Sequence, residues 1–395
     1  MTTKTTTLDT SGPAWLARLR LCLLADTPAL LIGPPGVGKT DLIRQTHDEL
    51  FPNLPLITII VSTVDPTELH GLPVVLPEGN VSRAPWAWVE ALVEAGGGTV
   101  FLDELSTATP ASQAAALRMV LEKVAGDTAL PDSVRFVAAC NPADCAAGGW
   151  DLAPPLANRF AHINVGSYST PAQCAALSRE LVPGWCDWLS SRYVSTAGER
   201  KAASMVGAFV SSNPSVLFDF PAEDSQRSGA WASPRSWATY VRALARGAEV
   251  GGWDTALDLC SAFVGHGAAS AFRSFAKTSG LPSPRDLLEG GDVYAFDRAR
   301  ADLARAVLLG CSTEAIHGDV ATAADRERLV EAAWTQVLAA CDSGLSEATP
   351  DAAKALATWR RDDSGQPIKK SPDEAEACRR LAKVIAPAKK ALGKI

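Results

Sequence analysis

Gly33-Pro34-Pro35-Gly36-Val37-Gly38-Lys39-Thr40 is the stretch that decides the fold of this sequence. It follows the apolar run Ala29–Ile32 and precedes the helical pattern Asp41–Phe51. A strand, a glycine loop and a helix in this order are the context of a P-loop, in which backbone N–H groups surround a phosphate chain. An ordinary Gly/Pro turn before a helix is the alternative, and the complete set of motif positions disfavours it. We therefore predict that all eight residues bind a nucleotide, with Lys39 reaching the β- and γ-phosphates and the Thr40 hydroxyl ligating Mg²⁺.

Two carboxylates directly follow a second apolar run. The run Thr99–Leu102 predicts a strand, and Asp103 and Glu104 come at its carboxyl end, where open α/β sheets bind their ligands. This is a Walker B pattern, in which Asp103 would hold Mg²⁺ through its water shell and Glu104 would orient and polarise the attacking water. An Asp-Glu pair that simply starts a loop is the alternative, which the preceding P-loop disfavours.

Further strands predict a parallel sheet. Leu56–Val61 is β-branched and apolar, which indicates a strand covered on both faces. Val134–Cys140 is a strand that ends in Asn141, and His162–Val165 is the last strand. Because strands alternate with helices, we expect about five parallel strands. Asn141 would hydrogen-bond the attacking water or the phosphate, although an Asx turn before Pro142 remains an alternative.

The sequence after Thr170 is dominated by helical patterns. Ser233 and Pro234 start one helix well, as N-cap and first helical residue. The predicted helices span Pro171–Leu181, Trp185–Tyr193, Arg200–Ser211, Trp237–Glu249, Thr255–Ala276, Val293–Leu309, Thr322–Cys341 and Glu374–Val384. The segment from Arg360 to the end holds ten Lys/Arg against five Asp/Glu, which indicates a solvated basic tail or a partner surface.

Composition limits the class of protein. The chain has 395 residues, 47% hydrophobic and 21% charged, so we expect a globular protein of two or three domains. No apolar run approaches the ~18 residues that span a bilayer, and the N-terminus lacks the apolar block of a signal peptide, so we expect a cytoplasmic protein without membrane contact. Nine scattered cysteines without a CxxC pair indicate a reducing compartment. The net charge of −7 disfavours a broad nucleic-acid surface.

Taken together, the motifs resemble those of an AAA+ ATPase, in the order Walker A, Walker B, sensor 1 (Asn141), arginine finger (Arg159) and sensor 2 (Arg235). Within that superfamily the chain resembles the MoxR and dynein-related group over about residues 13–280. The pieces that carry this resemblance are Asp65-Pro66, Leu69-His70-Gly71, Phe101–Ser106, Ala139–Pro142, Asn158–Phe160 and Ser233–Arg235.

The resemblance implies the fold class: an α/β P-loop NTPase core of the AAA+ type with a parallel five-stranded sheet, then an all-α lid and an α-helical C-terminal extension. The expected boundaries are a disordered tail at 1–12, the AAA+ domain at 13–168, the lid at 169–280 and the extension at 281–395.

The resemblance also implies a homo-oligomeric ring, usually a hexamer, with ATP between subunits. Arg159 would act in trans on the neighbour's γ-phosphate, and an intrachain salt bridge is the alternative. Arg235 would reach ATP from its own subunit, and an exposed arginine at a helix start is the alternative. Trp86 and Trp88 fall near the ring's pore, where they would grip a polypeptide unless they belong to the core, which is the more common use of such residues.

The expected function is that of a Mg·ATP-hydrolysing motor that remodels a partner protein. The resemblance suggests a separate protein with a von Willebrand factor A domain as the client. A motor acting on nucleic acid and a nucleotide-gated scaffold with little turnover are the alternatives.

Overall fold

A computed structural model describes residues 12–142, 145, 151–278 and 280–359. The tail predicted at 1–12 lies almost entirely outside these residues, as do the basic C-terminal segment and the predicted helix Glu374–Val384. The chain divides into two compact units, 1–169 and 170–395, which are described separately.

The first unit is built on a parallel sheet of five strands in the order β2-β5-β8-β1-β9, which confirms the expected core. The strands are β1 (Ala29–Ile32), β2 (Leu56–Ile60), β5 (Gly98–Asp103), β8 (Val134–Cys140) and β9 (Ala161–Asn164). The P-loop strand β1 lies between β8 and β9, so its loop emerges near the middle of the carboxyl edge.

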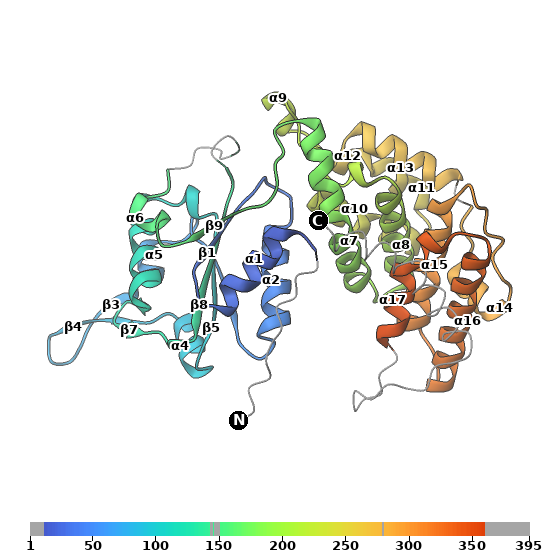
Figure 1. Cartoon of the computed structure of the whole chain (residues 1–395). Helices are drawn as coiled ribbons and strands as arrows, with labels where there is room; N and C mark the ends of the chain where they lie inside the picture. Colours follow the sequence, from blue (N-terminus) through green and yellow to red (C-terminus); the bar gives the residue numbers. More distant parts are fainter. Residues whose placement is uncertain (1–11, 143–144, 146–150, 279, 360–395) are drawn as a thin grey trace, which may run out of the picture. The chain divides into compact units, whose positions relative to one another are not determined.

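Helices cover both faces of this sheet (Figure 1). They are α1 (Ala14–Leu24), α2 (Lys39–Leu50), α3 (Pro66–His70), α4 (Ala87–Glu94), α5 (Pro110–Glu122) and α6 (Pro154–Ala157), with a 3-10 turn at Leu105–Thr107. Helices α1 and α2 lie on one face and α5 on the other (Figure 1). Alternate side chains of the central strands, such as Val100 and Leu102, are fully buried against α4 and α5. Because both faces of the central strands are covered, side chains that point to either face are apolar.

Two details of this unit differ from the sequence prediction. Strand β2 is an edge strand that pairs only with β5, and of its residues only Ile59 is buried, while Ile60 is 44% exposed. The prediction of a strand covered on both faces was therefore wrong there, because an apolar run does not reveal its place in the strand order. The residues Thr109-Pro110 also predict a capped helix that runs through Val124. In the structure Thr109 is the N-cap and Pro110 the first residue of α5, but the helix ends before Lys123, whose φ of 51° breaks it.

Two small hairpins complete the first unit. One pairs β3 (Leu72–Val75) with β4 (Val81–Ala84), in the segment 72–85, whose Pro and Gly residues predict a loop or small hairpin. The other pairs β6 (Val124–Ala125) with β7 (Thr128–Ala129). The backbone N–H of Arg83 donates to Asp127 Oδ2 at 2.7 Å, which ties the base of the first hairpin to the second.

The described residues of the second unit form helices joined by loops, without a strand (Figure 1). Its helices are α7 (Pro171–Arg192), α8 (Ala197–Ser212), α9 (Asp224–Arg227), α10 (Pro234–Glu249), α11 (Trp253–Leu259), α12 (Ser261–Val264), α13 (His266–Thr278), α14 (Pro284–Gly290), α15 (Ala301–His317), α16 (Ala323–Asp342) and α17 (Pro350–Trp359), with 3-10 turns at Pro214–Val216 and Ser346–Ala348. Helix α8 packs against α10 and α15, so the helices predicted as lid and as extension share one unit. The boundary at 280/281 stays a prediction.

Several helix bounds in this unit depend on packing that the sequence pattern does not reveal. The two helices predicted at 171–193 form one helix, α7, which continues through Pro183 because its apolar face is buried on both sides of that residue. The helix predicted at 255–276 is three helices, since Gly265 has a φ of 79° and ends α12. Residues 293–300 precede α15 instead of belonging to it, and the backbone N–H of Tyr294 donates to Gln336 Oε1.

Candidate functional site

The P-loop curls around the ammonium group of Lys39. Gly36 and Gly38 have φ angles of 75° and 96°, which a residue with a β-carbon rarely adopts. Gly38 is also the N-cap of α2 and offers no side chain to that helix start, so the first-turn N–H groups remain available to an anion. Among the other loop residues, Pro34 and Val37 are buried and Pro35 is half-buried.

Lys39 joins this loop to the neighbouring strand β8. Its Nζ lies 2.7 Å from Gly33 O, 3.0 Å from Pro34 O and 2.9 Å from Asn141 Oδ1. The backbone N–H of Gly33 also donates to Cys140 O at 3.3 Å. The structure thus brings together Lys39 and Asn141, which are 102 residues apart in the chain.

The Walker B carboxylate meets the hydroxyl at the start of α2. Thr40 Oγ1 donates to Asp103 Oδ2 at 3.0 Å. A hydroxyl and a carboxylate oxygen this close are hard oxygen ligands of the type that Mg²⁺ prefers. Among the described residues there is no cluster of three or more His, Cys, Asp or Glu that would cage a metal. Mg²⁺ characteristically binds through one or two such protein ligands together with substrate phosphates, so Thr40 and Asp103 fit the ion.

Glu104 directly follows β5 and has a left-handed backbone conformation, with φ 56° and ψ 36°. This conformation is uncommon for a residue with a side chain and is one that functional sites often hold. Its carboxylate accepts a hydrogen bond from Ser62 Oγ, with Oε2 at 2.6 Å. Ser62 follows β2, the neighbour of β5, and the Val61 N–H donates to Asp103 O. Sequence reasoning missed Ser62, although its place directly after a predicted strand was the signal that could have found it.

Cys140, the residue before Asn141 at the end of β8, is buried. The thiol of Cys140 has a pKa raised above its ordinary value because it is buried, although the nearby charge of Lys39 and a hydrogen bond with Ser106 act in the opposite direction. The thiol therefore stays protonated near neutral pH and behaves as a small apolar side chain.

The structure does not bring Arg159 to this cluster. Arg159 follows α6 and precedes β9, and the first residue of β9 pairs with Ala29, the first residue of β1. Arg159 therefore lies at the amino edge of the sheet, opposite the edge where the P-loop emerges. Its side chain is exposed and makes no ion pair with any described residue, so the intrachain salt bridge is not observed there.

Arg235 lies in the second unit, as the second residue of α10. Ser233 caps this helix, its hydroxyl accepting from the Ser236 N–H at 3.1 Å, and Pro234 is the first helical residue, as predicted. Arg235 is exposed, and within the described chain its guanidinium has no hydrogen-bond or ion-pair partner. The first turn of α10 contains no acidic side chain.

The two tryptophans at the start of α4 differ in their exposure to solvent. Trp88 is partly buried against the core of the first unit, as the core interpretation expects. Trp86 is 39% exposed, so that interpretation does not hold for it. Both indole N–H groups donate to carbonyls of α3, that of Trp86 to Thr67 O at 3.0 Å and that of Trp88 to Glu68 O at 3.3 Å.

Comparison with known proteins agrees with this geometry. Residues 28–160 match the family model of the AAA domain of the dynein-related subfamily. This stretch contains the P-loop and four of the five parallel strands, β1, β2, β5 and β8, and β9 follows it directly.

Two curated relatives are regulators of transcription. The chain is 31% identical over 133 residues to the transcriptional regulatory protein XylR of Pseudomonas putida, a match covering 31% of this chain and 24% of XylR. It is 30% identical over 188 residues to the Psp operon transcriptional activator of Escherichia coli, covering 41% of this chain and 56% of that protein. The matched part of the chain thus spans about a quarter of the length of XylR and about half of the length of the Psp operon activator.

Among solved structures, NtrX from Brucella abortus in complex with ATP is 16% identical, with 87% of this chain and 69% of that chain covered and a TM-score of 0.36. At that score the likeness adds nothing to what the strand order shows. Across the described residues, no helix combines the length and apolarity needed to cross a membrane.

Proposed function

We propose that this protein is a cytoplasmic ATPase that hydrolyses Mg·ATP and uses the energy to remodel a partner protein. The observation that carries the proposal is the meeting of Lys39, Thr40, Asp103, Glu104 and Asn141 at one edge of the sheet. These residues come from the P-loop and from two neighbouring strands, and together they provide a cation, hard oxygen ligands and a carboxylate.

Each residue has a distinct role in this proposal. The N–H groups of Gly33–Thr40 and the ammonium of Lys39 bind the phosphates. Mg²⁺ held by Thr40 and Asp103 would neutralise negative charge on the phosphates. Glu104 orients and polarises the attacking water, and Asn141 hydrogen-bonds the water or the γ-phosphate.

We also propose that the site is completed by a neighbouring subunit in a ring, usually of six. The four residues of β9 span about 13 Å at the usual rise of ~3.3 Å per residue, and Arg159 lies beyond the far end of them. A side chain there is badly placed for its own P-loop but is presented to another molecule. In the proposed ring, Arg159 stabilises the charge on the neighbour's γ-phosphate, and Arg235 reaches ATP from its own subunit.

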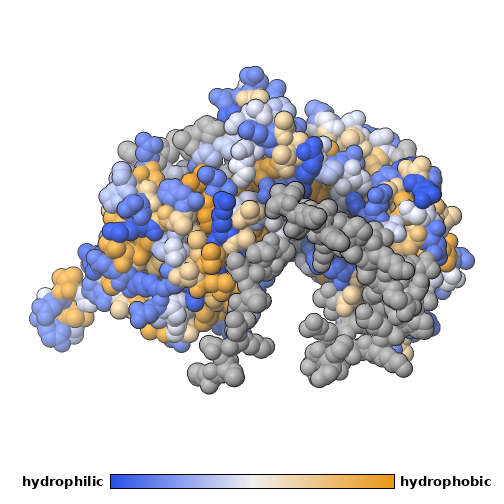
Figure 2. Space-filling view, viewed as in Figure 1, coloured by the Kyte–Doolittle hydropathy of each residue, from blue (hydrophilic) through white to orange (hydrophobic). Residues whose placement is uncertain are grey.

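A protein client is supported by the exposed hairpin β3–β4. Val75 and Val81 are 75% and 67% exposed, and Figure 2 shows apolar side chains gathered on this projection of the first unit. The bond from Arg83 N–H to Asp127 fixes the base of the hairpin. An apolar tip on an anchored base is suited to contact a polypeptide. A separate protein with a von Willebrand factor A domain is the client that the motif resemblance suggests.

A role in transcriptional regulation is a second candidate, favoured by the names of the two curated relatives. A motor acting directly on nucleic acid is less favoured, since the net charge is −7. A scaffold with little turnover is disfavoured by the presence of Glu104.

The test is capture of the client by a variant that binds ATP without hydrolysing it. We expect Glu104→Gln to keep ATP affinity, to lose hydrolysis by at least about 10²-fold, and to retain a protein in a pull-down with ATP. Val75→Ser in the same background should lose that protein, whereas Val250→Ser, at another exposed valine, should keep it. Recovery of DNA or RNA instead of a protein, or full hydrolysis by Glu104→Gln, would contradict the proposal.

A further inference from the structure

The second unit contains a cavity of about 550 Å³ between α8, α14 and α15. The connecting residues 281–283 close one of its sides. Pockets that hold small organic ligands generally measure about 300–1,000 Å³, so this cavity has the size of a ligand site. All of its lining residues lie between positions 197 and 319, and thus within one unit.

Most of the cavity wall is apolar. Met205 of α8, Leu287 of α14 and Val307 of α15 line it, and all three are more than nine-tenths buried. Such a wall favours the apolar part of a ligand over water, because apolar surface gains free energy when it is removed from solvent.

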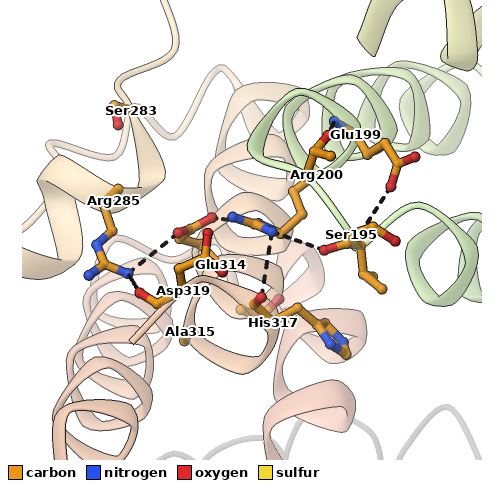
Figure 3. Close-up of polar contacts among 12 residues, drawn as sticks. Ser195, Glu199, Arg200, Ser283, Arg285, Glu314, Ala315, His317 and Asp319 are labelled. Atoms are coloured by element: carbon orange, nitrogen blue, oxygen red, sulfur yellow. Dashed lines mark hydrogen bonds and ion pairs between the residues drawn. The ribbon is translucent and has the colours of Figure 1, made fainter. Parts of the chain in front are cut away.

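The polar part of the wall is a row of three side chains, Arg285, Glu314 and Arg200 (Figure 3). Arg200 Nε donates to Glu314 Oε2 at 2.7 Å, and Arg285 Nη1 lies 3.6 Å from Glu314 Oε1. The Arg200 side chain is 5% exposed and that of Glu314 is 11% exposed. One buried carboxylate is thus shared by two guanidinium groups.

Other groups near the row leave it electropositive. Lys201 lines the cavity, with its Nζ 4.4 Å from the ring centroid of Trp253, and Arg326 donates to Ala315 O at 3.0 Å. Asp319 is exposed and also lines the cavity, so its carboxylate counts against the cations. Glu289 is exposed, is paired with Arg285 and is not among the lining residues. Burial lowers the pKa of Arg326, and the charges of Arg285 and Arg200 lower it further. Cations therefore outnumber carboxylates around the row.

We propose that this cavity binds a small organic anion with an apolar body. Its carboxylate or phosphate would lie at Arg200, Lys201 and Arg285, where cations outnumber carboxylates and planar guanidinium forks match such oxygens. Its apolar body would lie along Met205, Val307 and Leu287.

The cavity is suited to binding and not to catalysis. Cys311 lines it, but burial raises the pKa of its thiol to about 12, so the nucleophilic thiolate does not form near neutral pH. The Ser283 hydroxyl already accepts the N–H of Asp286 as the cap of α14. We infer a ligand that is held unchanged.

Isothermal titration of the full chain with decanoate tests this proposal, with decanol and inorganic phosphate as partial ligands. We expect decanoate to bind at one site per chain, and decanol, which lacks the charge, to bind at least about tenfold more weakly. Phosphate alone should show no saturable binding in the same range, since it has no apolar body.

Two variants locate the site. Lys201→Gln removes an exposed cation at the cavity and should weaken decanoate binding severalfold, whereas Lys277→Gln, at an exposed lysine outside the cavity, should not. Ala306→Met adds bulk to the wall and should abolish binding while far-UV circular dichroism stays unchanged. Equal binding of decanol and decanoate, equal effects of the two lysine variants, or no saturable decanoate binding would overturn the proposal.

Discussion

Glu104 is held in place by its own backbone and by a neighbouring hydroxyl. Glu104 has a positive φ directly after β5, and Ser62 Oγ donates to its carboxylate at 2.6 Å. The contact turns the carboxylate toward Ser62, which follows β2. We interpret the contact with Ser62 as a resting position from which Glu104 must be released to act on water.

Replacement of Ser62 tests this interpretation. Ser62→Ala removes the donor, so we expect the basal ATPase rate per chain to rise severalfold with KM for ATP unchanged, since Ser62 has no role in phosphate binding. Steady-state phosphate release measures the rate. The matched control is Thr63→Ala, because the Thr63 hydroxyl donates to Ile60 O and does not contact Glu104. A fall in rate toward that of Glu104→Gln would contradict the interpretation and would show that Ser62 holds Glu104 in its active position.

At the scale of elements, the ion pair between α8 and α15 joins the two halves of the second unit. Arg200 Nη1 also donates to Val194 O at 2.9 Å, so the guanidinium is held on two sides. If one partner of a buried ion pair is removed, little solvent is present to stabilise the charge that remains. Breaking the pair therefore destabilises the protein by more than the intact pair stabilises it.

Glu314→Gln is therefore expected to destabilise the second unit by about 3 kcal/mol, because it leaves the Arg200 charge buried without a carboxylate. Glu289→Gln, which breaks the exposed pair with Arg285, should cost less than about 1 kcal/mol. Urea unfolding followed by tryptophan fluorescence measures both. Similar costs for the two substitutions would contradict the role assigned to the buried pair.

Particular elements show how far the sequence alone reaches. The P-loop, the strands around it and the caps at Thr109 and Ser233 could be predicted, because their signals are local. The exposure of β2 could not, since strand order depends on pairing between segments far apart in the chain. Nor could the continuity of α7 through Pro183, since tertiary packing outweighs a local breaker there.

The candidate site divides in the same way. Asp103, Glu104 and Asn141 could be predicted to share one sheet edge, since each follows a parallel strand. The contact of Ser62 with Glu104 required the strand order β2-β5, which the sequence does not state. The ion pair of Arg200 with Glu314 joins residues 114 positions apart, and no motif marks either one.

At the scale of the whole molecule, the proposed ring makes the nucleotide site a shared one. The P-loop emerges at one edge of the sheet, and Arg159 is exposed at the other. In a ring of identical chains joined head to tail, the first edge of one subunit faces the second edge of the next. Each chain then contributes a P-loop to one site and an arginine to another.

Mixing two inactive variants tests this claim most directly. Arg159→Ala should bind ATP without hydrolysing it, and Lys39→Ala should bind ATP poorly, so neither is active alone. In an equal mixture that exchanges subunits, about a quarter of head-to-tail interfaces pair an intact P-loop with an intact Arg159. We predict that phosphate release returns in the mixture to a comparable fraction of the unmodified rate. A mixture that stays inactive although mixed oligomers form, or an Arg159→Ala variant that hydrolyses ATP normally, would contradict a site shared between subunits.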